Sequence, residues 1–380
     1  MSGAAAHGLT RDPAAPAWER IGAEFSDVLA AWPALGPWFE IDWHAPRPFA
    51  ATARVRTAAG TVFVKRHHPM LRSVDDLRCE HRFAAHVAAS LARQGVAVPV
   101  PLAGRDGATA QLAAGWVWEV LPAVPGHDVY RDTLSWEPPA QAGVAVAAGR
   151  ALAGLHRAAA GFEAPARRTP WLIGRFAPLD APDPLAALLG SVGTAALPHA
   201  ALARWPDWRS RCMQVLGGRL ARFAAEPRQP PLWTHGDWHV SNLLWTQAEA
   251  AGGAGEVAAV LDFGLADRSC ALFDLATAIE RNAVAWLDLD GNAPIARPAI
   301  ARALLDGYHA LQPLDRPARR TLAALLPVVH VGFALSEIGY FHVLRGEPDS
   351  VALAFETFLL GHASWFDTPD GVSLLAALLD

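Results

Sequence analysis

The sequence predicts an α+β protein with two lobes, a small antiparallel-sheet lobe followed by a larger, mostly helical lobe. Between about residues 39 and 66, apolar and polar residues alternate with a period of two, as in half-buried strands. Beyond about residue 140, apolar residues recur every three or four positions, as in amphipathic helices. Pro122 and Gly126 lie between the two patterns, so we expect a hinge near residues 120–126.

In the small lobe, a helix is expected from Trp18 to Trp32, because apolar residues there follow helical spacing. Residues 51–56 and 61–66 read as two strands of a hairpin around the turn 57–60. A helix over about 74–94 follows, with Gly95 as its C-cap. Further strands are expected near residues 96–100, 108–112 and 116–121.

The large lobe is predicted to be helical around a few short strands. The expected helices cover about residues 140–160, 207–224, 298–311, 316–335 and 350–365, and the strands cover residues 232–234, 243–246 and 257–262. We divide the chain into an N-terminal helical extension (1–37), a small lobe (38–121) and a helical large lobe (122–380).

Composition excludes several classes of protein. A hydrophobic content of 52% with 18% charged residues is typical of a globular protein rather than a disordered one. A net charge of −5 gives no reason to expect a nucleic-acid partner. The three cysteines have no CxxC spacing, so neither a disulfide framework nor a cysteine zinc site is indicated. No leader or convincing membrane span is recognised, and we expect a cytoplasmic protein without a membrane partner.

The candidate chemistry lies in a polar cluster on the predicted loop 234–242, which carries Asp237 and Asn242. Asp262 stands at the end of an apolar strand, where an unpaired carboxylate is costly. A bound cation would compensate its charge. Asp262 and Asn242 offer the oxygen ligands that Mg²⁺ prefers. Asp237 is then free to orient a hydroxyl nucleophile. This combination is typical of kinase-type phosphoryl transfer.

Lys65, the single lysine of the sequence, ends a predicted strand. The next helix places Glu80 inside its apolar stripe, where a charge is costly unless it is paired. We therefore predict that Glu80 pairs with Lys65.

These motifs resemble the aminoglycoside phosphotransferase/choline kinase-like family. The resemblance rests on three segments: His235-Gly236-Asp237-x-His239-x-x-Asn242, Asp262-Phe263 and Asp274-Leu275-Ala276. It implies a protein-kinase-like bilobal fold. It also implies that the protein is a kinase that phosphorylates a hydroxyl of a small molecule resembling an aminoglycoside, an amino alcohol or a sugar, with ATP or GTP as donor and Mg²⁺ as cofactor. The expected assembly is a monomer or a homodimer.

The resemblance also implies site roles. Asp237 would be the catalytic carboxylate, Asn242 and Asp262 the metal ligands, and Asp274 a buried support of the catalytic loop. On the nucleotide side, Lys65 and Glu80 would hold the phosphates, and the strand with Glu119 and Leu121 would offer backbone groups to the base. We interpret His156 as a core residue.

Two alternative functions stay open: a protein Ser/Thr kinase of the same fold, and a non-catalytic nucleotide-binding regulatory module. His235 and His239 also have the spacing of a helical zinc pair, although the glutamate of HExxH is absent. We interpret the segment 66–68 as a basic surface patch and Trp238 as a candidate wall of the acceptor pocket. The acidic residues of the C-terminal helices are compatible with a cationic acceptor: Glu280, Asp288, Asp290, Glu337 and Glu356.

Overall fold

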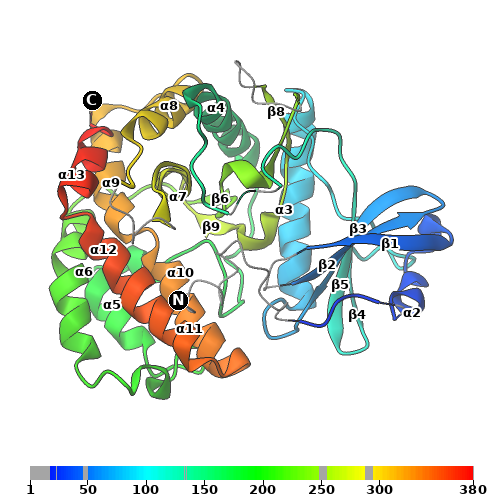
Figure 1. Ribbon diagram of the computed structural model, residues 1–380, viewed down its shortest axis with the longest axis horizontal. Helices are drawn as coiled ribbons and strands as arrows, with labels where there is room; N and C mark the ends of the chain where they lie inside the picture. Colours follow the sequence, from blue (N-terminus) through cyan, green and yellow to red (C-terminus); the bar gives the residue numbers. More distant parts are fainter. Residues whose placement is uncertain are drawn as a thin grey trace.

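The computed structural model describes residues 18–22, 24–45, 50–131, 133, 135–247, 255–286 and 294–379. Two lobes lie side by side, with the sheet on the right and the helices on the left in Figure 1. Helix α3 (Val74–Ala92) stands between them.

The small lobe contains a five-stranded antiparallel sheet with the order β1-β2-β3-β5-β4. Its strands are β1 (Trp38–His44), β2 (Ala51–Thr57), β3 (Gly60–His67), β4 (Ala110–Ala113) and β5 (Trp116–Pro122). The predicted hairpin is confirmed, because β2 and β3 pair as far as Thr57 and Gly60. Gly60 has a φ of 126°, a conformation open to glycine but strained for other residues. In the adjacent pairing of β3 with β5, Lys65 lies opposite Glu119.

The N-terminal segment is part of the small-lobe core. Helix α2 (Phe25–Leu29) is shorter than the predicted helix and is followed by a 3₁₀ turn, η1 (Pro33–Leu35). Phe25 and Trp32 are buried in one cluster with Val55 and Val64 of the sheet. This segment therefore covers a face of the sheet that would otherwise expose apolar side chains to water.

Helix α3 packs against the large lobe as well as the sheet. Ser73 caps its N-terminus by accepting a hydrogen bond from the backbone of Asp76. Phe83, in the middle of the helix, contacts the rings of Trp233 at 5.5 Å and Phe263 at 5.9 Å. These contacts fix α3, and with it Glu80, at the junction between the lobes.

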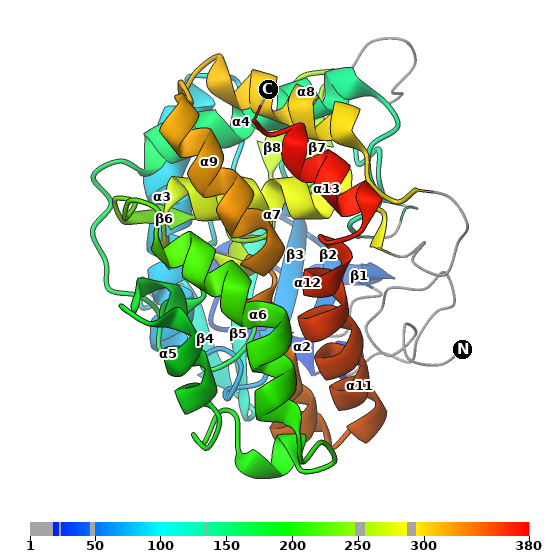
Figure 2. The same cartoon turned by 90° about the vertical axis from the view of Figure 1, so that its left-hand side faces the viewer.

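The large lobe is built around a buried central helix. Figure 2 shows α7 crossing the middle of the lobe behind α9. Its α-helices are α4 (Ala142–Ala159), α5 (Pro184–Ser191), α6 (Trp208–Ala224), α7 (Ala271–Ala283), α8 (Pro298–His309), α9 (Arg316–Leu325), α10 (Val331–Tyr340), α11 (Pro348–Leu353), α12 (His362–Trp365) and α13 (Pro369–Ala376). Shorter turns are η2 (Ala177–Asp180), η3 (His199–Leu202), η4 (Val240–Asn242), η5 (Phe263–Leu265) and η7 (Leu326–Val328), with π-helical segments η8 (Phe341–Arg345) and η9 (Ala354–Gly361).

Two short antiparallel sheets frame the loops that carry the polar motifs. One pairs β6 (Leu232–Thr234) with β9 (Asp267–Ser269), and the other pairs β7 (Leu243–Trp245) with β8 (Val257–Val260). The loop between β6 and β7 holds Asp237 and Asn242, and the segment after β8 holds Asp262. The two sheets therefore bring these motifs to the same part of the lobe.

Several predicted boundaries are wrong for identifiable reasons. The helix expected over 316–335 is interrupted by η7, which contains Pro327, a residue that cannot donate the backbone hydrogen bond of a continuing helix. The strand expected over 96–100 is reduced to one bridge between Ala97 and Ala259. Helix α7 escaped prediction, and all of its residues after Ala271 are buried, including the polar ones.

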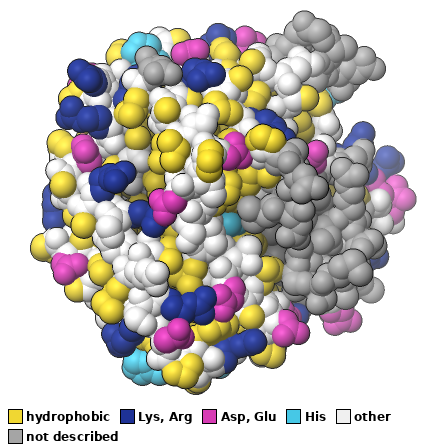
Figure 3. All heavy atoms as spheres, turned by 60° about the vertical axis from the view of Figure 1, so that its left-hand side comes forward, with side chains coloured by type: hydrophobic (Ala, Val, Ile, Leu, Met, Phe, Trp, Pro, Cys, Tyr) yellow, Lys and Arg dark blue, Asp and Glu magenta, His cyan; other side chains and the backbone are white. Residues whose placement is uncertain are grey.

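One helical run, Arg316–Arg345, is long and apolar enough to cross a membrane by composition, and 83% of its most apolar window is buried inside the protein. Such burial is typical of a core helix. On the face shown in Figure 3, side chains of both charges are scattered among apolar and neutral ones.

Candidate active site

The loop between β6 and β7 is held by a buried carboxylate. Asp274, at the start of α7, accepts backbone hydrogen bonds from His235 at 3.0 Å and Gly236 at 2.8 Å. His156 of α4 contacts the same carboxylate at 3.0 Å, which confirms its predicted core position and adds a polar role. Burial alone would raise the pKa of Asp274, but these hydrogen bonds hold it below its usual value. The predicted support role of Asp274 is confirmed.

Gly236 lets this loop turn sharply. Its φ is 76°, and a side chain there would approach the carbonyl oxygen of Leu265 to 2.5 Å. Both observations favour glycine at this position.

Asp237 and Asn242 lie in contact on the loop that the sequence analysis singled out. The Asn242 side-chain nitrogen donates to the backbone oxygen of Asp237 at 2.9 Å and to its Oδ2 at 3.2 Å. This orientation turns the Asn242 amide oxygen away from Asp237. Asp237 Oδ1 forms an ion pair with Nη1 of Arg281 and lies 3.5 Å from Nε2 of His239. The carboxylate is therefore oriented by groups on both sides.

Asp262 lies beside Lys65. Its Oδ1 is 3.2 Å from Lys65 Nζ and accepts a hydrogen bond from the Gly264 backbone at 3.3 Å. The Lys65 charge lowers the pKa of Asp262 to about 2. Burial alone would lower the pKa of Lys65, but Asp262 and the nearby Glu119 and Glu80 raise it above its usual value. Both groups are therefore charged at neutral pH.

The turn that follows Asp262 is held by two arginines. Asp262 has a φ of 54°, in the left-handed region that non-glycine residues rarely adopt. Arg72 and Arg167 both donate to the Gly264 carbonyl, at 2.7 Å and 2.9 Å. These hydrogen bonds maintain the backbone that projects the Asp262 carboxylate. The Leu261 backbone N–H also donates to the backbone carbonyl oxygen of Asn242 at 2.9 Å, which ties the segment before Asp262 to the Asp237 loop.

The predicted Lys65–Glu80 ion pair is wrong. The Glu80 carboxylate instead pairs with Arg167 at 2.9 Å, and Lys65 pairs with Asp262. Arg167 enters from the loop after α4 and reaches Glu80 because α3 packs against the large lobe. The physical premise, that a buried Glu80 needs a cation, is met by a residue far away in the sequence.

Glu119 is buried in a hydrogen-bonded cluster. Its two carboxylate oxygens lie 2.9 Å from Nε2 of His67 and Nε2 of His81. The predicted surface patch over 66–68 is therefore wrong for His67. It is also wrong for Arg66, which is buried, pairs with Glu24 at 3.0 Å and stacks over Trp116.

A cavity of about 300 Å³ opens between the lobes. Its wall contains the four residues that were predicted to bind a nucleotide and one of the two predicted metal ligands. They are Lys65, Glu80, Glu119 and Leu121, and Asp262. Phe263 and the pair Pro99 and Pro101 supply apolar surface. A cavity with an apolar wall and converging charges is typical of a small-ligand site.

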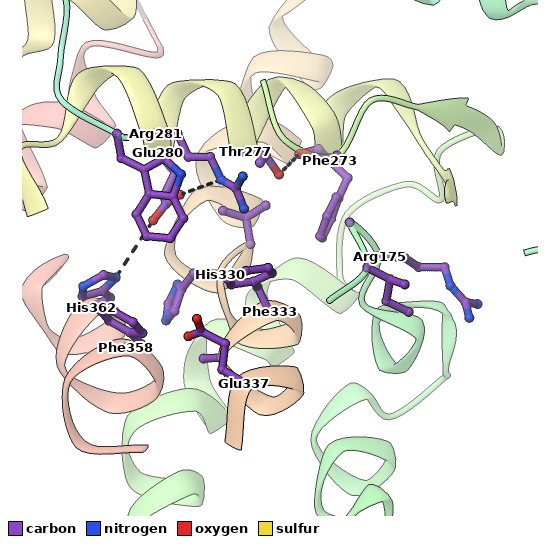
Figure 4. A pocket seen from close by; sticks show the side chains of 16 residues that line it. Arg175, Phe273, Thr277, Glu280, Arg281, His330, Phe333, Glu337, Phe358 and His362 are labelled. Carbon is purple, nitrogen blue, oxygen red and sulfur yellow. Dashed lines mark hydrogen bonds and ion pairs between the residues drawn. The ribbon is translucent and has the colours of Figure 1, made fainter. Parts of the chain in front are cut away.

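A second cavity, with about 510 Å³ of empty space including its mouth, lies on the other side of the Asp237 loop. Figure 4 shows its wall, formed by α7, α10 and the segment around His362. Gly236 and Arg281 line it, so it reaches the Asp237 loop. Aromatic residues surround the space, among them Trp136 and Phe333.

Of the predicted acceptor residues, Glu280 and Glu337 line this cavity. Glu356 instead pairs with Arg211 away from it, and Asp288 and Asp290 lie outside the described residues. The placement of Trp238 in the wall is wrong, because its side chain is buried in the core against His235.

Replacing Glu280 with Gln is expected to change how stability depends on pH. Burial raises the pKa of Glu280 from 4.5 to about 8, so across that interval the folded protein holds a proton that the unfolded chain has lost. This contribution to stability falls as pH rises. Glu280→Gln removes it, and the free energy of unfolding of the variant should rise relative to wild type between about pH 5 and about pH 8. Urea unfolding of both proteins at a series of pH values measures the difference in their free energies of unfolding. Groups that titrate in both proteins, such as His330, contribute equally and cancel in this difference. A difference independent of pH contradicts the prediction.

The geometry agrees with comparisons to known proteins. A sequence profile of the phosphotransferase enzyme family matches residues 49–321, well over half of the chain. The chain belongs to the phosphotransferase enzyme family. This phosphotransferase is 28% identical over 260 residues to the homoserine kinase of Phenylobacterium zucineum, and the match spans 66% of each chain, just under two thirds of the relative's length.

The phosphotransferase fold is shared with solved kinases. An amicoumacin kinase, solved with AMP-PNP and Ca²⁺, has a TM-score of 0.57 at 13% identity over 90% of this chain and 91% of that one. The microcompartment-associated aminopropanol kinase has a TM-score of 0.55 at 16% identity over 92% and 99%. At these identities the likeness shows the fold alone. The predicted resemblance, the kinase-like fold and the enzyme class are confirmed.

Two site residues of this phosphotransferase escaped the sequence analysis. Arg281 lies seven residues after Asp274 on α7, two turns further along the same helix face. Because Asp274 was already expected to support the Asp237 loop, this spacing could have predicted that Arg281 faces the same loop. Arg167 has no comparable signal, because it lies in a loop whose position depends on how α3 and α4 pack.

Proposed function

We propose that this enzyme transfers the γ-phosphoryl group of ATP to a hydroxyl of a small molecule. The observation that carries the proposal is the convergence of Lys65 and Asp262 on one wall with the linked pair Asp237 and Asn242 next to them. A lysine, a metal-binding carboxylate and a loop carboxylate with an asparagine are the parts that kinase-type transfer needs.

On the nucleotide side, Lys65 binds the phosphates as a point charge. Lys65 already pairs with Asp262 across the cavity, so its charge is directed to where phosphates would lie. Glu80, paired with Arg167, positions helix α3 at the cavity wall. The backbone of β5 around Glu119 and Leu121 meets the base, while the Glu119 side chain stays in its histidine cluster.

Mg²⁺ fits between Asn242 and Asp262. The Asn242 amide is turned with its oxygen away from Asp237, and the Asp262 side chain is about half exposed, at 49%. An amide oxygen and a carboxylate oxygen suit a hard cation that keeps waters and phosphate oxygens as its other ligands. When bound, the ion neutralises charge on the phosphates during transfer.

Asp237 accepts the hydrogen bond of the acceptor hydroxyl and aligns its oxygen. That oxygen forms a bond to the γ-phosphorus, the bond between this phosphorus and the β–γ bridging oxygen breaks, and ADP leaves with the electron pair. The hydroxyl proton passes to Asp237 and then to solvent. Catalysis comes from positioning and charge neutralisation, since the residues supply little covalent chemistry.

The test is an ADP-release screen over amino alcohols, hydroxy amino acids, aminoglycosides and sugars, with casein as a protein acceptor. Wild type is compared with Lys65→Arg. We expect turnover of a small alcohol by wild type and a loss of about 100-fold or more in kcat/KM for ATP in the variant, because the arginine fork cannot occupy the position of a compact ammonium. Turnover of casein alone would favour a protein kinase. Nucleotide binding without transfer to any acceptor would favour a regulatory module, and normal ATP use by Lys65→Arg would contradict the role of Lys65.

A further inference from the structure

The cavity beside the Asp237 loop is lined by a buried guanidinium and two buried carboxyl groups. The side chains of Arg281 and Glu280, neighbours on α7, are 5% and 7% exposed. Glu337 of α10 faces the same space and is 2% exposed. Buried charges are costly unless a partner compensates them. A ligand with a negative group near the guanidinium and a positive group near the two carboxyls would add compensating charge to this wall.

Arg281 is positioned to bind a carboxylate. Its guanidinium lies 5.0 Å from the ring of Trp136 and 5.4 Å from that of Phe333. The two rings place apolar surface beside the guanidinium, a group that can donate two hydrogen bonds to one carboxylate. Nη1 contacts Asp237. Nε is buried and makes no hydrogen bond within the described part of the chain, since Glu280 Oε2 lies 3.8 Å away.

Glu280 and Glu337 provide the complementary charge. Two basic side chains lie near the Glu280 carboxyl, the Arg281 guanidinium at 3.8 Å and the His362 imidazole at 4.0 Å, and both are beyond hydrogen-bonding distance. Figure 4 shows the two carboxylates on opposite sides of the cavity interior, from α7 and from α10. A ligand ammonium between them would donate to both and stabilise their charged forms.

We propose that the acceptor is a short hydroxy amino acid whose carboxylate binds Arg281, whose ammonium binds Glu280 and Glu337, and whose hydroxyl lies at Asp237. The acceptor must be short because Arg281 contacts Asp237 directly, so only a few bonds can separate the carboxylate from the reacting hydroxyl. The inference rests on the proposed function and uses the same transfer from ATP.

Three acceptors of matched length separate the two recognition contacts in the wild-type enzyme. Homoserine carries both charged groups, 3-amino-1-propanol lacks the carboxylate and 4-hydroxybutanoate lacks the ammonium. Each missing charged hydrogen-bonding group should lower kcat/KM by about 10- to 100-fold, so homoserine is expected to be the best of the three. Serine, one methylene shorter, tests the spacer length.

Variants then assign each contact. Arg281→Met should reduce the ratio of kcat/KM for homoserine over 3-amino-1-propanol to about one, whatever its effect on the common rate through Asp237. Glu280→Gln should do the same for homoserine over 4-hydroxybutanoate. The matched controls are Arg211→Met and Glu356→Gln, an exposed pair outside the cavity, which should leave both ratios at the wild-type values.

The outcomes distinguish the two proposals. Efficient phosphorylation of a neutral sugar or an aminoglycoside in preference to every hydroxy amino acid would overturn this inference and leave the kinase intact. Equal rates with homoserine and 3-amino-1-propanol in wild type would overturn the assignment of Arg281, even if the variants fail to fold. ATP-dependent transfer to no alcohol would instead overturn the proposed function itself.

Discussion

Asp237→Asn is expected to lower kcat by about 10²- to 10⁴-fold while leaving the fold intact. The amide keeps the size of the carboxylate and can still contact Asn242, but it is a poor acceptor for the hydroxyl proton. It also removes the charge that faces Arg281. Because the change acts on transfer rather than nucleotide binding, the Kd for ATP should stay within about threefold of wild type. Initial rates with a saturating acceptor, together with ATP titration by calorimetry, measure the two effects.

The control for this prediction is Asp367→Asn, which alters an exposed carboxylate paired with Arg219 on the large lobe. Its kcat should equal that of wild type. Thermal unfolding of all three proteins checks that the loop variant is folded. A folded Asp237→Asn enzyme with at least a third of the wild-type kcat would show that Asp237 does not handle the hydroxyl.

Asp262→Asn is expected to have the second large effect, a loss of about 100-fold or more in kcat/KM for ATP. The variant removes one of two proposed ligands for Mg²⁺ and the nearest counter-charge of Lys65. The rate should recover in part as free Mg²⁺ is raised, because mass action offsets a weaker site. The measurement is the initial rate against free Mg²⁺ at fixed ATP, for wild type and variant.

Asp106→Asn supplies the matched control, since Asp106 is a small-lobe loop carboxylate that accepts hydrogen bonds from Ala108 and Gln111. Its Mg²⁺ dependence should follow that of wild type. If Asp262→Asn were folded and showed an unchanged Mg²⁺ dependence, the carboxylate would have no part in metal binding.

Much of the candidate site could be predicted because its parts are local in the sequence. Asp237 and Asn242 lie five residues apart on one loop, so their contact depends only on how that loop turns. Lys65 ends a strand whose alternation is visible in the sequence, and the hairpin around Gly60 fixes its register. Asp274 could be placed at the start of a supporting element by its motif, although the extent of α7 could not.

The partners of buried charges were predicted less well. Glu80 was correctly expected to need a cation, yet the predicted partner, the strand residue Lys65, is not the one it meets. Arg66 and His67 read as a surface patch, but the strands β3 and β5 turn them toward Glu24 and Glu119. In each case the residue type correctly indicated that a charged or polar partner was needed, but the sequence did not show which residue that partner would be.

The sequence by itself determined the two-lobed α+β organisation, the hairpin that carries Lys65 and the loop that carries Asp237 and Asn242. Periodicity and turn residues act over a few positions, so they are visible without the fold. The tertiary structure alone decided that Arg167 neutralises Glu80, that Arg281 meets Asp237 and that Glu280 shares a cavity with Glu337. The physical reason is that a buried charge takes whichever opposite charge the packing of distant helices brings within a few ångströms, and no local pattern records that distance.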